Sequence, residues 1–238
     1  MKSVARLEVS LINNPRSSVE IDLKGLVRIA KSGFGPQMTE ADVRVHVLGG
    51  DFVHLLRVDK KEVGFAAYRR FEAGEGKNKE GSGQEREGTI LYLAGIVVDG
   101  EHQGMGLFGL SLGNAIRENR PSYVALRTQN PVVYHRLLRS EHISAVYPNV
   151  SGELASPMIM QVAEIVAERL GMEGMDRHTF VERGTYGQSL YQNNPVSSNE
   201  AANDFFRSRL GIKVGRGDSV LLIGQVGGSE TEKYGDFA

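Results

Sequence analysis

The sequence of 238 residues contains no cysteine and no apolar run long enough to cross a membrane. Without cysteine, disulfide bonds, thiolate metal sites and a cysteine nucleophile are excluded. A membrane-spanning helix needs about 18 consecutive apolar residues, and the first residues also lack the apolar stretch of a signal peptide. We therefore expect a cytoplasmic protein that does not associate with a membrane.

Charge of one sign is not in excess either. The 28 basic and 29 acidic residues give a formal net charge of −1, so we expect no nucleic-acid partner. The six histidines include no H-x-x-x-H or H-E-x-x-H spacing, and we expect no metal site. With 40% apolar residues, the chain has enough material for one domain over residues 1–238.

Residues 89–109 hold the most informative pattern of the chain. The apolar run 89–98 predicts a strand buried on both faces, and a glycine-rich turn then opens a helix that runs to about residue 119. Gly104 and Gly106 allow a sharp turn and the close approach of a ligand. The unpaired N–H groups at the helix start predict an anion site, most naturally for phosphate, although such glycines also occur in ordinary turns.

Two common phosphate motifs do not fit this turn. Gly104, Gly106 and Gly109 have the G-x-G-x-x-G spacing, but no N-terminal βαβ unit and no ribose-binding acid some 20 residues later accompany them. A P-loop is excluded because no Gly-Lys-Ser/Thr follows.

A third pattern fits better. The segment from Val98 through Gln103, Gly104 and Gly106 resembles the acyl-CoA-binding motif of the GNAT N-acyltransferase superfamily. That motif is a strand-ending Val followed, five residues later, by Gln/Arg-x-x-Gly-x-Gly/Ala. Phe108 stands where the motif has its last small residue. The resemblance is convincing over about residues 50–140.

The resemblance implies an α+β fold with a mixed, mostly antiparallel central sheet flanked by helices. The order of expected elements agrees with it: a strand at 5–12, two short helices, and strands at 52–58 and 63–71. Capping-box patterns at Ser17 with Glu20 and at Thr39 with Asp42 predict where the two helices begin. Residues 74–88 contain no apolar side chain and predict a mobile loop.

A strand at 123–128 leads into a second helix start, with Asn130 as N-cap and Pro131 at the first helical position. The resemblance implies that Asn130 contacts acetyl-CoA and that the pantetheine arm bonds to the central strand. It also makes Tyr134 the nearest candidate to protonate the departing thiolate, unless Tyr134 is a half-buried structural residue. The implied cofactor-binding set is Ile96, Val97, Val98, Gln103, Gly104, Met105, Gly106, Leu107, Phe108 and Asn130.

The chain after Arg139 departs from the family pattern. Residues 141–197 read as an insertion with one strong helix at 156–170 and a short strand near 179–182. The insertion either covers the acceptor cleft or forms the interface of a homodimer. A short helix from Ser198, strands at 212–214 and 219–226, and a frayed tail from residue 227 follow. The helices after Asn130 and after Ser198 compete to complete the cofactor site, and we favour the first.

The resemblance implies an acetyl-CoA-dependent N-acetyltransferase that acts on the amine of a small molecule or peptide. Without cysteine, direct attack in a ternary complex is the expected route. A backbone N–H of Val97 or Val98 is placed to stabilise the oxyanion. Asp99, Glu101, His102 and Tyr92 remain open as candidates for the general base. The alternatives are a non-catalytic sensor or interaction module that binds CoA or another phosphorylated ligand, and a nucleotide-binding protein.

Overall fold

The structure is a computed structural model that describes residues 5–73 and 88–227. The loop predicted at 74–88 and the tail predicted from residue 227 therefore lie outside the described residues, apart from one residue each. Within the described ranges, no helix is both long enough and apolar enough to cross a membrane.

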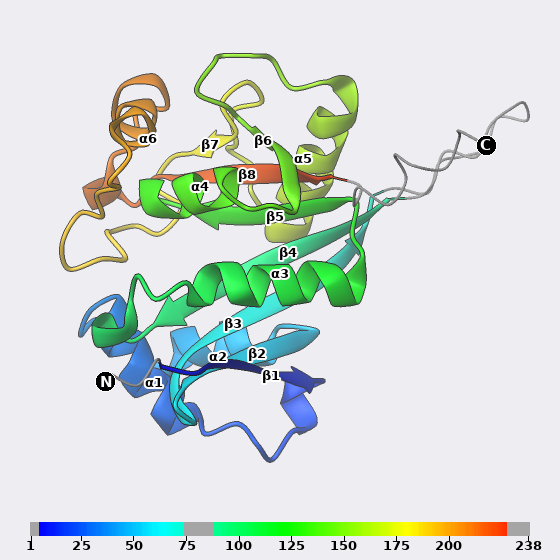
Figure 1. Cartoon of the computed structure of the whole chain (residues 1–238). Helices are drawn as coiled ribbons and strands as arrows, with labels where there is room; N and C mark the ends of the chain where they lie inside the picture. The colour runs from blue at the N-terminus through cyan, green and yellow to red at the C-terminus, as the bar shows by residue number, and fades with distance from the viewer. Residues whose placement is uncertain (1–4, 74–87, 228–238) are drawn as a thin grey trace, which may run out of the picture.

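One eight-stranded sheet forms the centre of the molecule, with the order β1-β2-β3-β4-β5-β8-β6 and with β7 paired to β8 (Figure 1). β4 and β5 pair in parallel, and the other described pairs are antiparallel. This is the mixed, mostly antiparallel sheet predicted from the sequence. The strands are β1 (Leu7–Asn13), β2 (Phe52–Val58), β3 (Lys61–Glu72), β4 (Thr89–Val98), β5 (Tyr123–Thr128), β6 (Ile143–Tyr147), β7 (Val181–Glu182) and β8 (Ser219–Val226).

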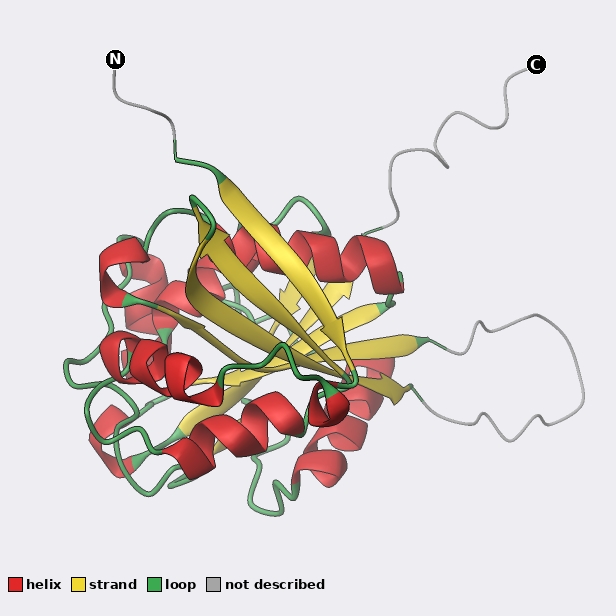
Figure 2. Cartoon of the chain, turned by 90° about the horizontal axis from the view of Figure 1, so that it is seen from below, coloured by secondary structure: helices red, strands yellow, loops and turns green. Residues whose placement is uncertain are grey.

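Helices lie on both sides of the twisted sheet (Figure 2). They are α1 (Leu23–Gly33), α2 (Glu40–Leu48), α3 (Leu107–Asn119), α4 (Pro131–Leu138), α5 (Pro157–Leu170) and α6 (Glu200–Asp204), which continues as a π-helical turn (Phe205–Arg209). Short 3₁₀ turns cover Pro15–Ser17, Gly100–His102 and Val214–Arg216.

Alternation along the strands decides which helix packs on which face. On β2, Val53 and Leu55 join the cluster formed with α1 and α2, whereas His54 between them reaches Ser111 of α3 on the opposite face. On β3, Tyr68 points to the same face and bonds to the same hydroxyl. Both faces of these strands are therefore buried, as the nearly continuous apolar sequence predicts.

Most predicted helix ends are confirmed. Thr39 and Asp42 form the capping box of α2, and Asn130 caps α4 with Pro131 at its first position. Ser156 caps α5, which ends at a left-handed Gly171. These ends were predictable because each depends on side chains within three residues of the helix terminus.

The predicted start of the first helix is wrong. Val19 is fully exposed instead of lying on the buried stripe, and α1 begins only at Leu23. The reason is local, because the Ser17 hydroxyl donates to the Asn14 carbonyl within a 3₁₀ turn that begins at Pro15. That hydroxyl therefore does not cap the helix.

One predicted strand is wrong, and one strand of the structure was not predicted. Residues 212–214 form no strand, because the Lys213 N–H donates to Asp218 and the chain turns there. The strand β6 was missed because only Val146 of its residues is buried and no clear alternation marks it. Within the predicted insertion at 141–197, β6 and β7 pair with β8, and α5 packs on the main core. The segment is therefore part of the domain and its sheet.

Candidate functional site

The parallel strands β4 and β5 separate before either of them ends. Their pairing covers only Ile90–Leu93 against Tyr123–Leu126, although β4 continues to Val98. Along β3, the partners shift from Gly95 to Leu93, so that Ala94 forms a β-bulge. Figure 1 shows the two strands together where they begin and apart where α3 and α4 start.

The separation leaves backbone groups of β4 facing the gap. Asp99 N–H donates to Val63 O of β3. Because N–H groups alternate sides along a strand, those of Ile96 and Val98 point away from β3, toward the space that β5 has left. Of the two oxyanion donors considered from the sequence, Val98 therefore has the suitable orientation and Val97 does not.

The glycine turn after β4 has the geometry that the sequence predicts. Gly104 and Gly106 adopt left-handed φ values of 84° and 90°, which side chains rarely permit. Gly106 caps α3 without any side-chain hydrogen bond, so the first N–H groups of the helix are left to a ligand or solvent. The Gln103 side chain braces the turn by donating to the carbonyls of Val98 and Gly33.

A cavity of about 800 Å³ lies beside this turn. Of the ten predicted cofactor-binding residues, nine line it: Ile96, Val97, Val98, Gln103, Gly104, Gly106, Leu107, Phe108 and Asn130. The exception is Met105, which is 37% exposed. α4 lines the cavity and α6 does not. This agrees with the expectation that the helix after Asn130, and not the helix after Ser198, completes the site.

The large cavity, which we call the cofactor cleft, suits a nucleotide thioester in its chemistry. A Cβ added at Gly109 would meet no atom within 4 Å, so the first turn of α3 opens onto free space. Arg136 of α4 and Arg139 at its C-cap are exposed and line the cleft, and guanidinium groups bind phosphate well. Leu112 and Val133 provide apolar surface deeper in the cleft. Acetyl-CoA combines phosphates with an extended, less polar arm, and these residues fit both parts.

A second, smaller cavity of about 280 Å³ adjoins the cleft, and we call it the acceptor cavity. Phe34, Ile96, Val97, Val133 and Tyr191 line both spaces. The two cavities therefore meet at the end of β4, where β5 has separated from it.

Two basic side chains line the acceptor cavity from opposite sides. His46 of α2 packs against Gly95, and burial together with Arg69 and Arg127 holds its pKa below the usual value, so the imidazole is neutral near pH 7. Arg127 of β5 lies over the Tyr186 ring, with 5.2 Å between the guanidinium carbon and the ring centroid. Burial opposes the charge on Arg127, but Tyr186, Tyr92 and Glu182 raise its pKa and the guanidinium stays charged.

A loop from the segment 141–197 covers both cavities. Tyr186 and residues 188–191 line the acceptor cavity, and residues 191–196 line the cofactor cleft. The loop is fixed by hydrogen bonds from the Gln37 side chain to Leu190 O and from Gln192 N–H to Phe34 O. The predicted covering role agrees with this position of the loop, and the predicted homodimer interface stays a prediction.

Tyr191 occupies the junction of the two cavities. Burial raises its pKa to about 12, while hydrogen bonds with the side chains of Asn130 and Thr128 oppose that rise. Its ring packs on Phe34, with 5.1 Å between the ring centroids. The hydroxyl is therefore protonated at neutral pH and held beside the N-terminus of α4.

Tyr134, the catalytic candidate of the sequence, lies elsewhere. Its ring is fully buried between Phe205 and Phe206, and its hydroxyl accepts a hydrogen bond from Val150 N–H. It lines neither cavity. The position follows from helical periodicity, which turns a residue four positions after Asn130 toward the core. This geometry corrects the catalytic assignment and supports the packing role.

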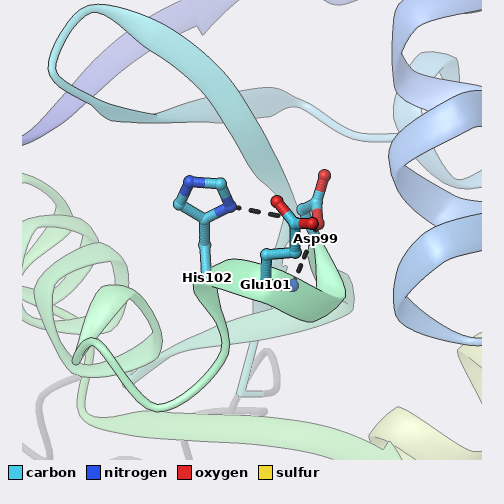
Figure 3. Close-up of side chains that lie close together, drawn as sticks. All are labelled: Asp99, Glu101 and His102. Atoms are coloured by element: carbon cyan, nitrogen blue, oxygen red, sulfur yellow. Dashed lines mark hydrogen bonds and ion pairs between the residues drawn. The ribbon is translucent and has the colours of Figure 1, made fainter.

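The acidic residues after β4 form a compact turn (Figure 3). Asp99 Oδ1 accepts hydrogen bonds from Ser32 Oγ and Glu101 N–H, and His102 Nδ1 lies 3.9 Å from it. One carboxylate oxygen each of Asp99 and Glu101 and a ring nitrogen of His102, the atom types that bind metal ions, lie within 4.8 Å of one another. The contacts of Asp99 stabilise the turn, and only His102 of the three lines a cavity, the cofactor cleft. Of the base candidates from the sequence, only Tyr92 borders the acceptor cavity.

His46, Arg127 and Tyr191 line the cavities but were not predicted from the sequence. His46 lies near the end of a short helix, and nothing in its neighbours marks it as functional. Arg127 carried a usable signal, because it interrupts an otherwise apolar strand just before Asn130. Tyr191 comes from a loop that is far away in sequence, so only tertiary structure places it.

The architecture combines two helices after the first strand, an antiparallel meander, and a parallel pair that separates around a glycine turn. The fold matches the GNAT fold. Solved GNAT acetyltransferase structures match this chain over most of its length at low sequence identity. No protein-family model and no curated protein matches the sequence.

Three solved structures illustrate the likeness. The IAA acetyltransferase from Bacillus cereus ATCC 14579 is 12% identical, with 93% of this chain and 100% of that one covered and a TM-score of 0.45. The ribosomal-protein-S18-alanine N-acetyltransferase from Escherichia coli is 14% identical, with 95% and 98% covered and a TM-score of 0.45. A GNAT family acetyltransferase from Elizabethkingia anophelis with acetyl-CoA bound is 11% identical, with 92% and 98% covered and a TM-score of 0.43. At such scores, the chemistry of this chain must be argued from its own site.

Proposed function

We propose that the protein is an acyl-CoA-dependent N-acyltransferase that transfers acetyl from acetyl-CoA to an amine. One observation carries the proposal: the cofactor cleft and the acceptor cavity meet where β4 and β5 separate, and they share five lining residues. Such a junction can hold a thioester and an amine in contact. Holding two reactants in attack geometry contributes up to about 7–11 kcal/mol to lowering the barrier.

The reaction needs a base, an oxyanion donor and a leaving-group partner. Neutral His46 accepts a proton from the acceptor ammonium, directly or through water, and the free amine nitrogen attacks the thioester carbon. The Val98 N–H stabilises the oxyanion. The carbon–sulfur bond then breaks, and CoA departs as a thiolate while the remaining amine proton is lost to solvent.

Tyr191 acts on the thiolate as a hydrogen-bond donor. Its pKa of about 12 exceeds that of an ordinary thiol, near 8.5, so full proton transfer from the phenol is uphill. A hydrogen bond to the developing negative charge nevertheless stabilises the leaving group. The thiolate takes its proton from solvent.

Release of free thiol from acetyl-CoA, measured with a panel of amines, tests the proposal. We expect release that depends on an amine, together with an acetylated product detected by mass spectrometry. If acetyl-CoA raises the melting temperature but no amine accelerates thiol release, the enzyme assignment is wrong. The chain would then be a module that binds CoA without catalysis.

A further inference from the structure

The acceptor cavity has an electrostatic character that narrows the class of acceptor. Its charged lining side chains are Asp42 and Arg127, with His46 neutral. The Asp42 carboxylate is already used in the capping box of α2, where Oδ2 accepts from both the N–H and the hydroxyl of Thr39. These hydrogen bonds lower the pKa of Asp42 and keep it negative, and Arg127 supplies the positive charge of the lining.

Arg127 is largely buried, and a hydrogen bond with the Tyr186 side chain uses only part of its donor capacity. The nearest acidic atom, Glu182 Oε2, is 3.6 Å from Nη1, which exceeds ordinary hydrogen-bond length, and that oxygen already accepts from Thr185. Among the described residues, Nε has no partner. A guanidinium has five N–H donors in a fixed fork that suits a carboxylate, so Arg127 has capacity for an anionic ligand.

A second arginine adds positive charge behind the cavity. Arg69 of β3 pairs in register with Tyr92, and its buried Nε also has no partner in the described part of the chain. Both Arg69 and Arg127 lower the pKa of His46, although only Arg127 lines the cavity. The two guanidinium groups are balanced by the carboxylates of Glu182 and Asp42, so the cavity has no excess negative charge to attract a polycation, and Arg127 can bind a carboxylate.

The position of Arg127 matches a short molecule with an amine and a carboxylate. Arg127 follows Leu126, the last β5 residue paired with β4, and lines the same cavity as Gly95 and His46. The cavity of about 280 Å³ is at the small end of ligand sites. Met38, Val43, Phe65 and Leu126 form apolar walls suited to one side chain.

We propose that the acceptor is an amino acid or a similar small amine whose carboxylate binds Arg127 while its amine faces His46. This inference rests on the proposed function in taking the small cavity as the acceptor site. It excludes polyamines and aminoglycosides as preferred acceptors.

A binding experiment tests this inference independently of turnover. The probes are the common amino acids and their N-acetyl derivatives, each paired with its neutral amide, together with spermidine, and the readout is the melting temperature in the presence of CoA. We expect at least one carboxylate to stabilise the protein, with an affinity about tenfold or more above that of its amide. Arg127→Gln should abolish that preference, and Arg177→Gln, at an exposed arginine, should preserve it.

Two controls separate the possible failures. Arg127 does not line the cofactor cleft, so Arg127→Gln should keep its stabilisation by acetyl-CoA, which shows that the variant is folded. Equal binding of acids and amides, preferred binding of spermidine, or no stabilisation by any probe overturns the inference. A carboxylate preference without thiol release on any amine supports carboxylate binding by Arg127 and contradicts the proposed transferase, so the two failures are distinguishable.

Discussion

The imidazole of His46 packs against Gly95 of β4, with its Cγ 3.8 Å from the position that a Cβ on Gly95 would take. This is ordinary van der Waals distance, so α2 holds the imidazole directly against the strand. The contact lies on the part of β4 that β5 has left, where an amine can reach the thioester.

His46→Gln should lower kcat/KM by about 10²–10⁴-fold, because the amine loses its proton acceptor. His46 is faced by Asp42 on its own helix, Arg69 on β3 and Arg127 on β5, and its pKa is lowered. The wild-type rate should therefore fall only as pH drops through a pKa below 6.5. Above that pKa, His46 stays neutral and its titration should not change the rate. The variant should lose this acid limb.

The pH profile of the initial rate checks the role of His46. His178→Gln, at an exposed histidine outside both cavities, should leave both rate and profile unchanged. A His46→Gln variant with the wild-type acid limb would show that another group is the base.

Two tyrosines offer a matched comparison. Tyr191→Phe should lower kcat by about 10- to 100-fold, since a hydrogen bond to a charged group contributes about 1.5–3 kcal/mol. Tyr134→Phe should leave kcat unchanged and reduce the free energy of unfolding by about 1 kcal/mol, because the hydroxyl accepts from Val150 N–H. Steady-state kinetics and urea unfolding of both variants measure these effects. The opposite pattern would restore Tyr134 to the reaction.

Asp218 anchors the covering loop, and its removal should destabilise the fold. The buried carboxylate accepts from Arg183, Arg216 and the N–H groups of Lys213 and Gly184. Burial alone would raise the pKa of Asp218, but these hydrogen bonds together hold it well below its usual range. Asp218→Asn should cost about 2 kcal/mol, a modest value because both arginines are about half exposed and keep their water.

The pH dependence of that cost has a definite sign. A carboxyl group with a depressed folded-state pKa stabilises the protein above its unfolded pKa, near 3.9, and loses this contribution as pH falls toward the folded value. Urea unfolding should show the full difference between wild type and Asp218→Asn above about pH 5 and a narrowing difference below about pH 4. A difference that stays constant with pH would assign the cost to packing.

The sequence predicted the elements whose signals are local. Gly104 and Gly106 require left-handed backbone, and Asn130 with Pro131 defines a helix start, so the cofactor turn and α4 were readable. β6 was not predictable, because an edge strand pairs through its backbone and the side chains of β6 show no clear alternation of apolar and polar residues. The predicted start of α1 was wrong because a serine hydroxyl can bond within a turn as well as cap a helix.

The catalytic residues were less predictable than the cofactor site. The cofactor side is formed by one continuous stretch and the next helix, so a motif can describe it. The acceptor side combines His46, Arg127 and Tyr191 from α2, β5 and a distant loop. Their chemistry depends on burial and on one another, which spacing along the chain does not encode.

The central claim is that the turn between β4 and α3 binds acetyl-CoA. Gly109→Phe tests it well, because Gly109 lines the cofactor cleft, has no left-handed backbone, and has no atom within 4 Å of the position of an added Cβ. Gly174→Phe is the matched control, since Gly174 is exposed, has equal free space and lies outside the cleft.

The decisive measurement is the thermal midpoint of the three proteins with and without acetyl-CoA. At about 100 times the dissociation constant, a ligand of the folded state adds about 2.7 kcal/mol of stability. The account predicts a clear rise for wild type and Gly174→Phe and none for a folded Gly109→Phe. No rise in wild type, or an undiminished rise in Gly109→Phe, would contradict it.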